Sequence, residues 1–160
     1  MSRFVTFGEI MMRLNPEGYG RFVQAERLEA SYAGGEANVA VSVAEQLVKR
    51  FGCKRVAVTL RTSLSAFDNL WAGMLYDAKA KKACFSKEYA LHIVDRVGGG
   101  DSFGGGLIYA LATGKKPQAA IDFAVAASAL KHSIEHDFNL VSAAEVESLA
   151  SGNGTGRVQR

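Results

Sequence analysis

A dense run of glycines constrains this chain more than any other feature. The stretch Arg96–Leu107 reads RVGGGDSFGGGL, in which three glycines precede Asp101 and three follow it. Glycine loses more conformational freedom on folding than any other residue, so several are kept together only where a tight bend or a close approach needs them. The apolar residues that follow have helical spacing, which predicts a glycine-rich bend leading into a helix.

Such a bend directs several backbone N–H groups toward one point. The helix dipole adds about half a positive charge there, and phosphate is a common occupant of the resulting site. A Cβ atom would hold the phosphate away from the backbone, so Gly98, Gly99 and Gly100 form a candidate anion hole. Neither the P-loop nor the dinucleotide fingerprint fits, because Gly114 is followed by two lysines without a hydroxyl and Phe103 stands where a glycine is needed.

Asp101 stands beside this candidate anion hole, where a carboxylate would repel a bound phosphate. One interpretation is that Asp101 is the N-cap of the helix. The other is that it is a general base, which takes a proton from an acceptor hydroxyl while the amides stabilise the transferring phosphoryl group. The residues alone leave both open. The later glycines, Gly104–Gly106, cost about 1 kcal/mol each in a helix relative to Ala, so we expect the helix to approach a sheet or a ligand closely.

Composition limits the class of protein. A chain of 160 residues is typical of one domain, and 48% hydrophobic residues can form a core. The net charge of +3 is too small and dispersed to indicate nucleic-acid binding, and no run predicts a membrane span or a signal peptide. Cys53 and Cys84 are far apart and form neither a metal motif nor a disulfide framework, so we expect a cytoplasmic protein. His132 and His136 have helical spacing but no third ligand, so no metal site is predicted.

Strands and helices alternate along the chain, which predicts an α/β fold. A hairpin within it makes the expected sheet mixed. The expected elements are a strand at Arg3–Ile10, a helix at Glu36–Arg50, a strand at Arg55–Leu60, a hairpin of Gly73–Tyr76 with Ala83–Ser86, a strand at Ala90–Val94, helices at Ser102–Thr113 and 117–134, and a capping box at 142–145 that opens a last helix.

Three motifs, in this order along the chain, resemble the ribokinase-like (pfkB) carbohydrate kinases. Phe7–Leu14 (FGEIMMRL) is similar to 2-keto-3-deoxygluconate kinases in particular, Tyr32–Ala40 (YAGGEANVA) to the first family signature, and Asp95–Phe103 (DRVGGGDSF) to the second. The resemblance implies a ribokinase-like αβα sandwich with a mixed, mostly parallel sheet. It also implies ATP-dependent phosphorylation of a sugar acid, such as 2-keto-3-deoxygluconate to its 6-phosphate, with Mg²⁺ on the phosphates.

The resemblance also implies roles for particular residues. Asp101 matches the catalytic base, and the preceding glycines match the anion hole. Gly34, Gly35 and Asn38 match the segment that contacts the sugar acid. The residues implied in ATP binding are Leu60, Arg61, Thr62, Ser63, Ser65, Ala66 and Val125, the last standing where an Asn is usual.

The family's members are roughly twice as long as this chain, so the fold is expected to be truncated internally. Residues 1–42 resemble the N-terminal part with a partial lid, residues 44–150 resemble the C-terminal ATP-binding part, and 151–160 is expected to be a flexible tail of the same domain. Loss of central strands would expose apolar sheet edges unless the sheet re-closes or another chain, as in a homodimer, covers them. A shortened kinase and a sequence that lacks an internal segment both fit.

Three functions follow from this reading. The first is a sugar-acid kinase, the second is a nucleotide-binding fragment without turnover, and the third is an α/β scaffold in which Asp101 only caps a helix. ATP turnover that depends on a sugar acid would indicate the kinase. Nucleotide binding without turnover would indicate the fragment, and neither activity would indicate the scaffold.

Overall fold

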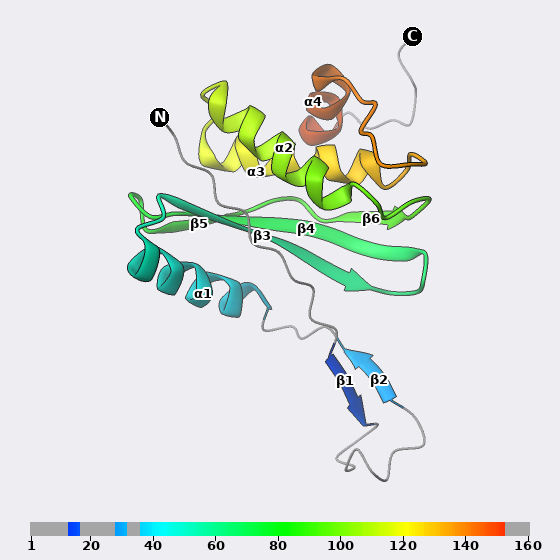
Figure 1. The fold of residues 1–160 in the computed structure, drawn as a ribbon, viewed down its shortest axis with the longest axis horizontal. Coiled ribbons are helices and arrows are strands. Elements are labelled where there is room, and N and C mark those ends of the chain that lie inside the picture. Colours follow the sequence, from blue (N-terminus) through cyan, green and yellow to red (C-terminus); the bar gives the residue numbers. More distant parts are fainter. Residues whose placement is uncertain (1–12, 17–27, 32–35, 153–160) are drawn as a thin grey trace.

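A four-stranded antiparallel sheet lies at the centre of the fold (Figure 1). The computed structural model describes residues 13–16, 28–31 and 36–152. Strand β4 (Asp68–Asp77) pairs with β3 (Arg55–Ser63) along one edge and with both β5 (Lys82–Phe85) and β6 (Tyr89–His92) along the other. β4 therefore connects the other three strands of this sheet.

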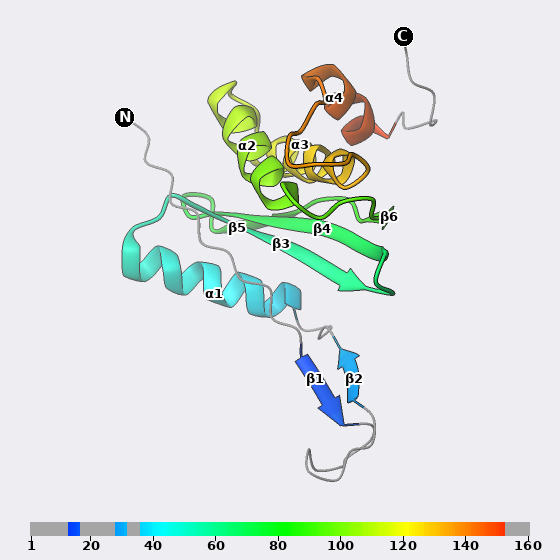
Figure 2. The same ribbon diagram turned by 45° about the vertical axis from the view of Figure 1, so that its right-hand side comes forward.

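Helices cover both faces of the sheet. Helix α1 (Glu36–Phe51) lies on one face, and α2 (Gly99–Ala112) and α3 (Pro117–Lys131) lie on the other, with α4 (Ala143–Ser151) packed on α3 (Figure 2). This three-layer arrangement confirms the predicted α/β class. The strands β1 (Arg13–Pro16) and β2 (Leu28–Ser31) form a separate antiparallel pair.

The prediction of a mostly parallel sheet was wrong for the described residues, in which every strand pair is antiparallel. The reason is the length of the connections. Residues 64–67 join β3 to β4, and residues 78–81 join β4 to β5. Parallel neighbours need a crossover of about a dozen residues or more, whereas such short turns permit only antiparallel pairing.

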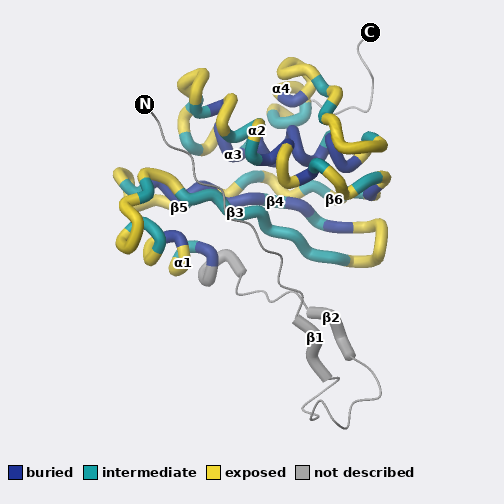
Figure 3. The backbone as a smooth tube through the Cα atoms, in the orientation of Figure 1, coloured by how far each residue is buried: buried dark blue, intermediate teal, exposed yellow. Residues whose placement is uncertain are grey.

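β4 supports a separate core on each face because its side chains alternate. Trp71 and Leu75 are buried beneath α2 and α3, whereas Met74 and Tyr76 pack with the apolar residues of α1. Figure 3 shows this strand and the inner side of α3 as the most continuous buried regions. Gly73 faces α3, where a Cβ atom would lie 2.7 Å from Val125 Cγ2, so α3 approaches the sheet closely at this point.

Most predicted elements are confirmed. Gly52, with φ of +66°, ends α1, as expected for a glycine in the left-handed conformation. Ser142 and Glu145 form the predicted capping box of α4. Helix α3 ends three residues earlier than expected, because the amides of Ser133 and Ile134 bond back to Leu130 and Lys131 and tighten the last turn. The expected strand at Arg3–Ile10 lies outside the described residues.

One of the three later glycines marks the close approach predicted for α2. A Cβ atom on Gly106 would lie 3.0 Å from Ala127 Cβ and 3.3 Å from Ala124 Cα, so the neighbour is helix α3 rather than a sheet. Gly104 and Gly105 have open space at the same position. Only Gly106 is therefore explained by helix packing.

This difference predicts unequal responses to the same substitution. Gly105→Ala should raise the free energy of unfolding by about 0.5–1 kcal/mol, because Ala loses less backbone entropy and meets no atom. Gly106→Ala should gain less or lose stability, because its methyl group pushes α2 from α3. Urea denaturation of both variants measures this, and an equal gain in both would contradict the close packing.

Candidate functional site

The glycine bend forms the N-terminal end of α2. Gly98 is the N-cap and has φ of +78°, a left-handed conformation that glycine adopts without strain. A Cβ atom here would overlap the carbonyl oxygen of Asp137, so glycine is also required sterically. The predicted bend leading into a helix is confirmed, and it is packed against the loop that follows α3.

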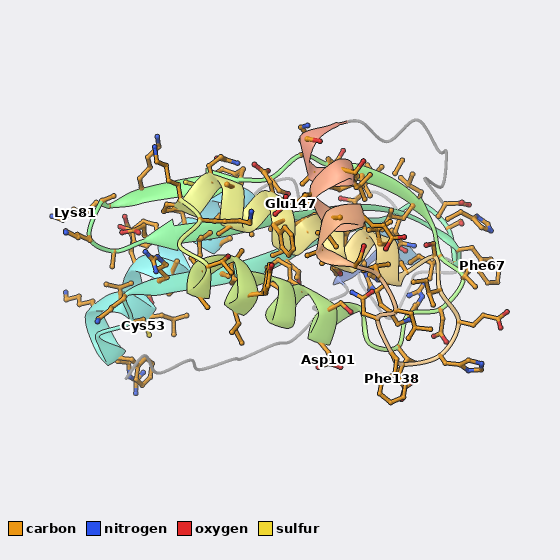
Figure 4. All side chains as sticks on the ribbon, turned by 90° about the horizontal axis from the view of Figure 1, so that it is seen from above. Cys53, Phe67, Lys81, Asp101, Phe138 and Glu147 are labelled. Carbon is orange, nitrogen blue, oxygen red and sulfur yellow. The ribbon has the colours of Figure 1, made fainter. Side chains whose placement is uncertain are left out.

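Asp101 is the third residue of α2, so the interpretation of this residue as the N-cap was wrong. The cap position belongs to Gly98, and no side chain caps the helix. Asp101 is exposed, and its carboxylate lies outside the ribbon at the N-terminal end of the helix (Figure 4). A carboxylate in the first turn is stabilised by the helix dipole, and here it remains open to solvent.

Two backbone amides of the bend remain available to a ligand. The amide of Gly99 donates to Arg96 O at 3.3 Å, and that of Ser102 donates to Gly98 O at 2.8 Å. The amides of Gly100 and Asp101 have no acceptor among the described residues. Gly100 is exposed, and no atom lies within 4 Å of the position of its missing Cβ. The exposed donors are therefore those of residues 100 and 101.

The buried side of the bend is held by helix α3. Ser128 Oγ donates to Gly99 O at 2.8 Å, and His132 lies so close that a Cβ on Gly99 would come within 2.6 Å of its Cε1. The imidazole in turn has its Nδ1 2.7 Å from Ser128 O and its ring centroid 4.8 Å from that of Trp71. Gly99 is thus needed for packing and does not present open space to a ligand.

A second set of contacts joins the segment before the bend to the loop after α3. The Asp95 carboxylate accepts from the Val97 amide at 2.9 Å and from the His136 amide at 3.0 Å. These bonds, above all that from Val97, hold the pKa of Asp95 below its usual value, and the positive charges of Lys131 and His136 act in the same direction. The amide of Val94 donates to His132 O at 2.8 Å.

The residues predicted to line the ATP site are divided by the fold. Leu60 to Ser63 belong to β3 rather than to a loop, so alternate side chains face opposite sides of the sheet. Leu60 packs toward α1, whereas Arg61 is paired with Trp71 and lies on the side of α2. Because of this alternation, Thr62 lies on the side of α1 with Leu60, and Ser63 lies on the side of α2.

The turn at residues 64–67 is the loop part of that prediction. Ser65 Oγ accepts a hydrogen bond from the Asp68 amide at 2.9 Å and donates one to the Asp68 carboxylate at 2.7 Å. The Arg96 guanidinium donates to Ala66 O. The turn is therefore joined to the residues that precede the glycine bend.

Val125 is fully buried against Gly73, so the prediction that it contacts a nucleotide is corrected: its side chain has no exposed surface.

The residues predicted to contact the sugar acid are not brought to the bend by the described structure. Gly34 and Gly35 lie outside the described residues, and Asn38 is in the first turns of α1, on the other side of the sheet. Ser128, Lys131 and His132, which hold the bend from behind, were missed as site residues. The signal was available in the sequence, because these polar residues interrupt an otherwise apolar helical run.

Within the described part of the chain, no three His, Cys, Asp or Glu side chains gather as metal ligands, and no helix has the length and hydropathy to cross a membrane. His132 is the C-cap residue of α3 and is buried.

The comparisons with known proteins match this geometry. Residues 72–134, which run from within β4 to just past α3 and include the glycine bend, match the model of the pfkB family of carbohydrate kinases. The chain is therefore related to the pfkB carbohydrate kinases, which confirms the resemblance drawn from the motif around Asp101. The comparison with curated proteins found no match.

Solved structures of carbohydrate kinases are similar to this chain in both sequence and fold. The chain is 43% identical to 2-dehydro-3-deoxygluconokinase from Thermotoga maritima, with a TM-score of 0.70, over 76% of this chain and 36% of that one. A PfkB family carbohydrate kinase from Listeria grayi is 27% identical, with a TM-score of 0.64, over 75% of this chain and 40% of that one. These matches confirm the ribokinase-like fold, and the chain spans about two fifths or less of the length of each.

His132 predicts a pH dependence of stability. Burial lowers the pKa of His132 below its usual 6.5, and the charges of Lys131, Arg61 and Arg96 act in the same direction. Below about pH 6.5 the unfolded chain therefore binds a proton that the folded chain excludes, so stability should fall as the pH drops through this range until the folded pKa is reached.

Urea unfolding at pH 7.5 and 5.5 measures this loss of stability. His132→Gln should be less stable at pH 7.5 but should lose less on acidification than the unchanged protein. His136→Asn, a change at an exposed residue, serves as the control and should retain the full loss. An identical pH dependence in all three would contradict the buried neutral imidazole.

Proposed function

We propose that this chain carries the phosphoryl-transfer part of an ATP-dependent sugar-acid kinase, whose acceptor is 2-keto-3-deoxygluconate and whose product is the 6-phosphate. The observation that carries the proposal is the pairing of two unbonded amides, Gly100 and Asp101, with an exposed carboxylate in the same helical turn. The 43% identity to a 2-dehydro-3-deoxygluconokinase supports the acceptor class.

The amides and the carboxylate divide the chemistry between them. The amides and the dipole of α2 stabilise the negative charge that develops on the phosphoryl oxygens. The Asp101 carboxylate accepts the proton of the attacking hydroxyl, so the oxygen becomes a better nucleophile as the bond to phosphorus forms. The rigid support beneath Gly99 fixes the donors before the substrate arrives, which avoids reorganisation during the reaction.

Cationic side chains near the bend suit a polyphosphate. Arg61 and Arg96 are both close enough to His132 to lower its pKa, and neither pairs with a carboxylate in the described part of the chain. Arg61 Nε is buried without a partner there. The nucleotide would extend from the bend toward these guanidinium groups, along the odd-numbered side of β3.

Mg²⁺ fits this site as an ion carried by the nucleotide. The Asp95 carboxylate is already bonded to two amides, so Asp101 is the carboxylate of the bend that is free to approach the ion, directly or through water. When bound, Mg²⁺ neutralises charge on the phosphates. A cytoplasmic location and a homodimer remain predictions.

A nucleotide-binding fragment without turnover is the second candidate. It is favoured by length, since this chain covers 36% of the kinase from Thermotoga maritima, and the described residues bring no acceptor-binding side chain to the bend. Binding of ATP without sugar-dependent turnover would select it.

Replacement of the proposed base separates catalysis from binding. Asp101→Asn should lower the rate of sugar-dependent ADP formation by about 10²–10⁴-fold, because an amide does not accept the proton. The affinity for ATP should stay within a few-fold. Asp122→Asn, on α3, keeps the hydrogen bond with Gln118 and serves as the matched control. An unchanged rate in Asp101→Asn would remove the general-base role.

Gly100→Ala tests the anion site without disturbing the core. The new methyl group meets no protein atom, and Cβ atoms in a helix tilt toward its N-terminus, where the phosphate would lie. Thermal stability should be kept or raised, while the affinity for ATP falls about tenfold, measured by calorimetry. Gly105→Ala, which also opens on free space, should leave the affinity unchanged. Equal affinity in both variants would argue against the anion site.

A further inference from the structure

Lys131 is a fully buried charged side chain that the proposed mechanism does not use. It is the last residue of α3, and none of its surface is exposed. Burial of an ammonium group is costly unless polar groups surround it. A lysine at such a position therefore needs polar partners within the protein.

Lys131 contacts both the loop after α3 and the glycine bend. Its Nζ donates to Ile134 O at 3.0 Å. A Cβ atom on Gly98 would lie 3.1 Å from the Cε atom of Lys131. No carboxylate lies within 4.0 Å of the ammonium in the described part of the chain. Asp95 is a compensating charge without a direct ion pair, because the charge of Lys131 helps to lower the pKa of Asp95.

Asp95 carries the effect of this charge to the bend. Its carboxylate accepts hydrogen bonds from the amide of Val97, which precedes Gly98, and from the amide of His136. His136 lies two residues after Ile134, whose carbonyl oxygen accepts the hydrogen bond from Lys131. Lys131, Asp95 and the two loop segments therefore form one connected polar cluster. Through Gly98, which Lys131 contacts, this cluster adjoins the start of α2.

We propose that Lys131 is a positioning residue for the phosphate-binding bend. Its ammonium group is an internal cation that holds the loop after α3 and, through Asp95, the segment before Gly98 in one arrangement, so that the exposed amides stay directed outward. The consequence for phosphoryl transfer rests on the proposed function, whereas the effect on the conformation of the bend does not.

A simpler role is stabilisation of the end of α3. A cation near the C-terminus of a helix interacts favourably with its dipole, and this alone would keep a lysine at position 131. The two roles predict different locations for the damage when the charge is removed. A helix-end role affects the last turn of α3, whereas the positioning role affects residues 94–101 and 133–137 together.

Hydrogen exchange followed by mass spectrometry distinguishes these roles. In Lys131→Met, the hydrogen-bonded amides in residues 94–101 and 133–137 should exchange about tenfold faster, while those of β4 stay unchanged. Lys116→Met, a change at an exposed lysine at the start of α3, is the matched control and should not alter either segment. Faster exchange confined to residues 126–131 would overturn the proposal.

Lys131→Gln separates charge from hydrogen bonding and provides a second variant should Lys131→Met fail to fold. Glutamine can donate a hydrogen bond but carries no charge. The proposal expects faster exchange in both loop segments here too. Exchange equal to that of the unchanged protein would show that the charge is dispensable and would overturn the proposal.

A double-mutant cycle with Asp95→Asn tests the proposed route. If Lys131 acts through Asp95, the double variant should exchange in residues 94–101 about as fast as the more affected single variant. Multiplied effects on the exchange rate would mean independent roles and would contradict the route.

The affinity for ATP is measured on the same variants. A loss of affinity that follows the increase in exchange rate supports the functional consequence. If the unchanged protein binds no ATP, the proposed function fails while the exchange result still decides the role of Lys131.

Discussion

The hydrogen bond from Ser128 to the carbonyl of Gly99 is the contact on which the candidate site depends. It joins the start of α2 to the last turns of α3 inside the core, where loss of one partner leaves a buried polar atom unsatisfied. His132 fills the remaining space beneath Gly99 and is itself fixed by Trp71 on β4. The amides that face solvent are therefore held from behind by the sheet and by a second helix.

The same arrangement explains why the glycines of one motif have different roles. Gly98 supplies a left-handed turn, Gly99 makes room for His132, and Gly100 leaves open space above the amides. Gly106 permits the contact of α2 with α3 that brings Ser128 within reach. The backbone conformation, the packing of the core and the chemistry of the site thus each require a glycine at a separate position.

Local patterns in the sequence were sufficient for most elements and for the glycine bend. The capping box of α4, the hairpin around residues 78–81 and the end of α1 at Gly52 follow from short-range rules, which tertiary contacts seldom change. Strand direction was predicted wrongly because the mostly parallel sheet was taken from the family resemblance, whereas the short connections between β3, β4 and β5 permit only antiparallel pairing. The place of Asp101 at the third helical position, rather than at the cap, depended on the left-handed turn at Gly98.

Other parts of the site could not be derived from periodicity. Whether Arg61 or Leu60 faces α2 is decided by the register of β3 against β4, and the burial of Val125 by the approach of α3 to Gly73. That register has a wider consequence. The side chains of β4 alternate between two different cores. Insertion of one residue within the strand would therefore put a bulky side chain where Gly73 faces α3, or would turn Met74 away from the core beneath α1. A change in the length of the β3–β5 region is therefore better tolerated at the turns on either end of β4 than within the strand, and one of these turns adjoins the candidate site.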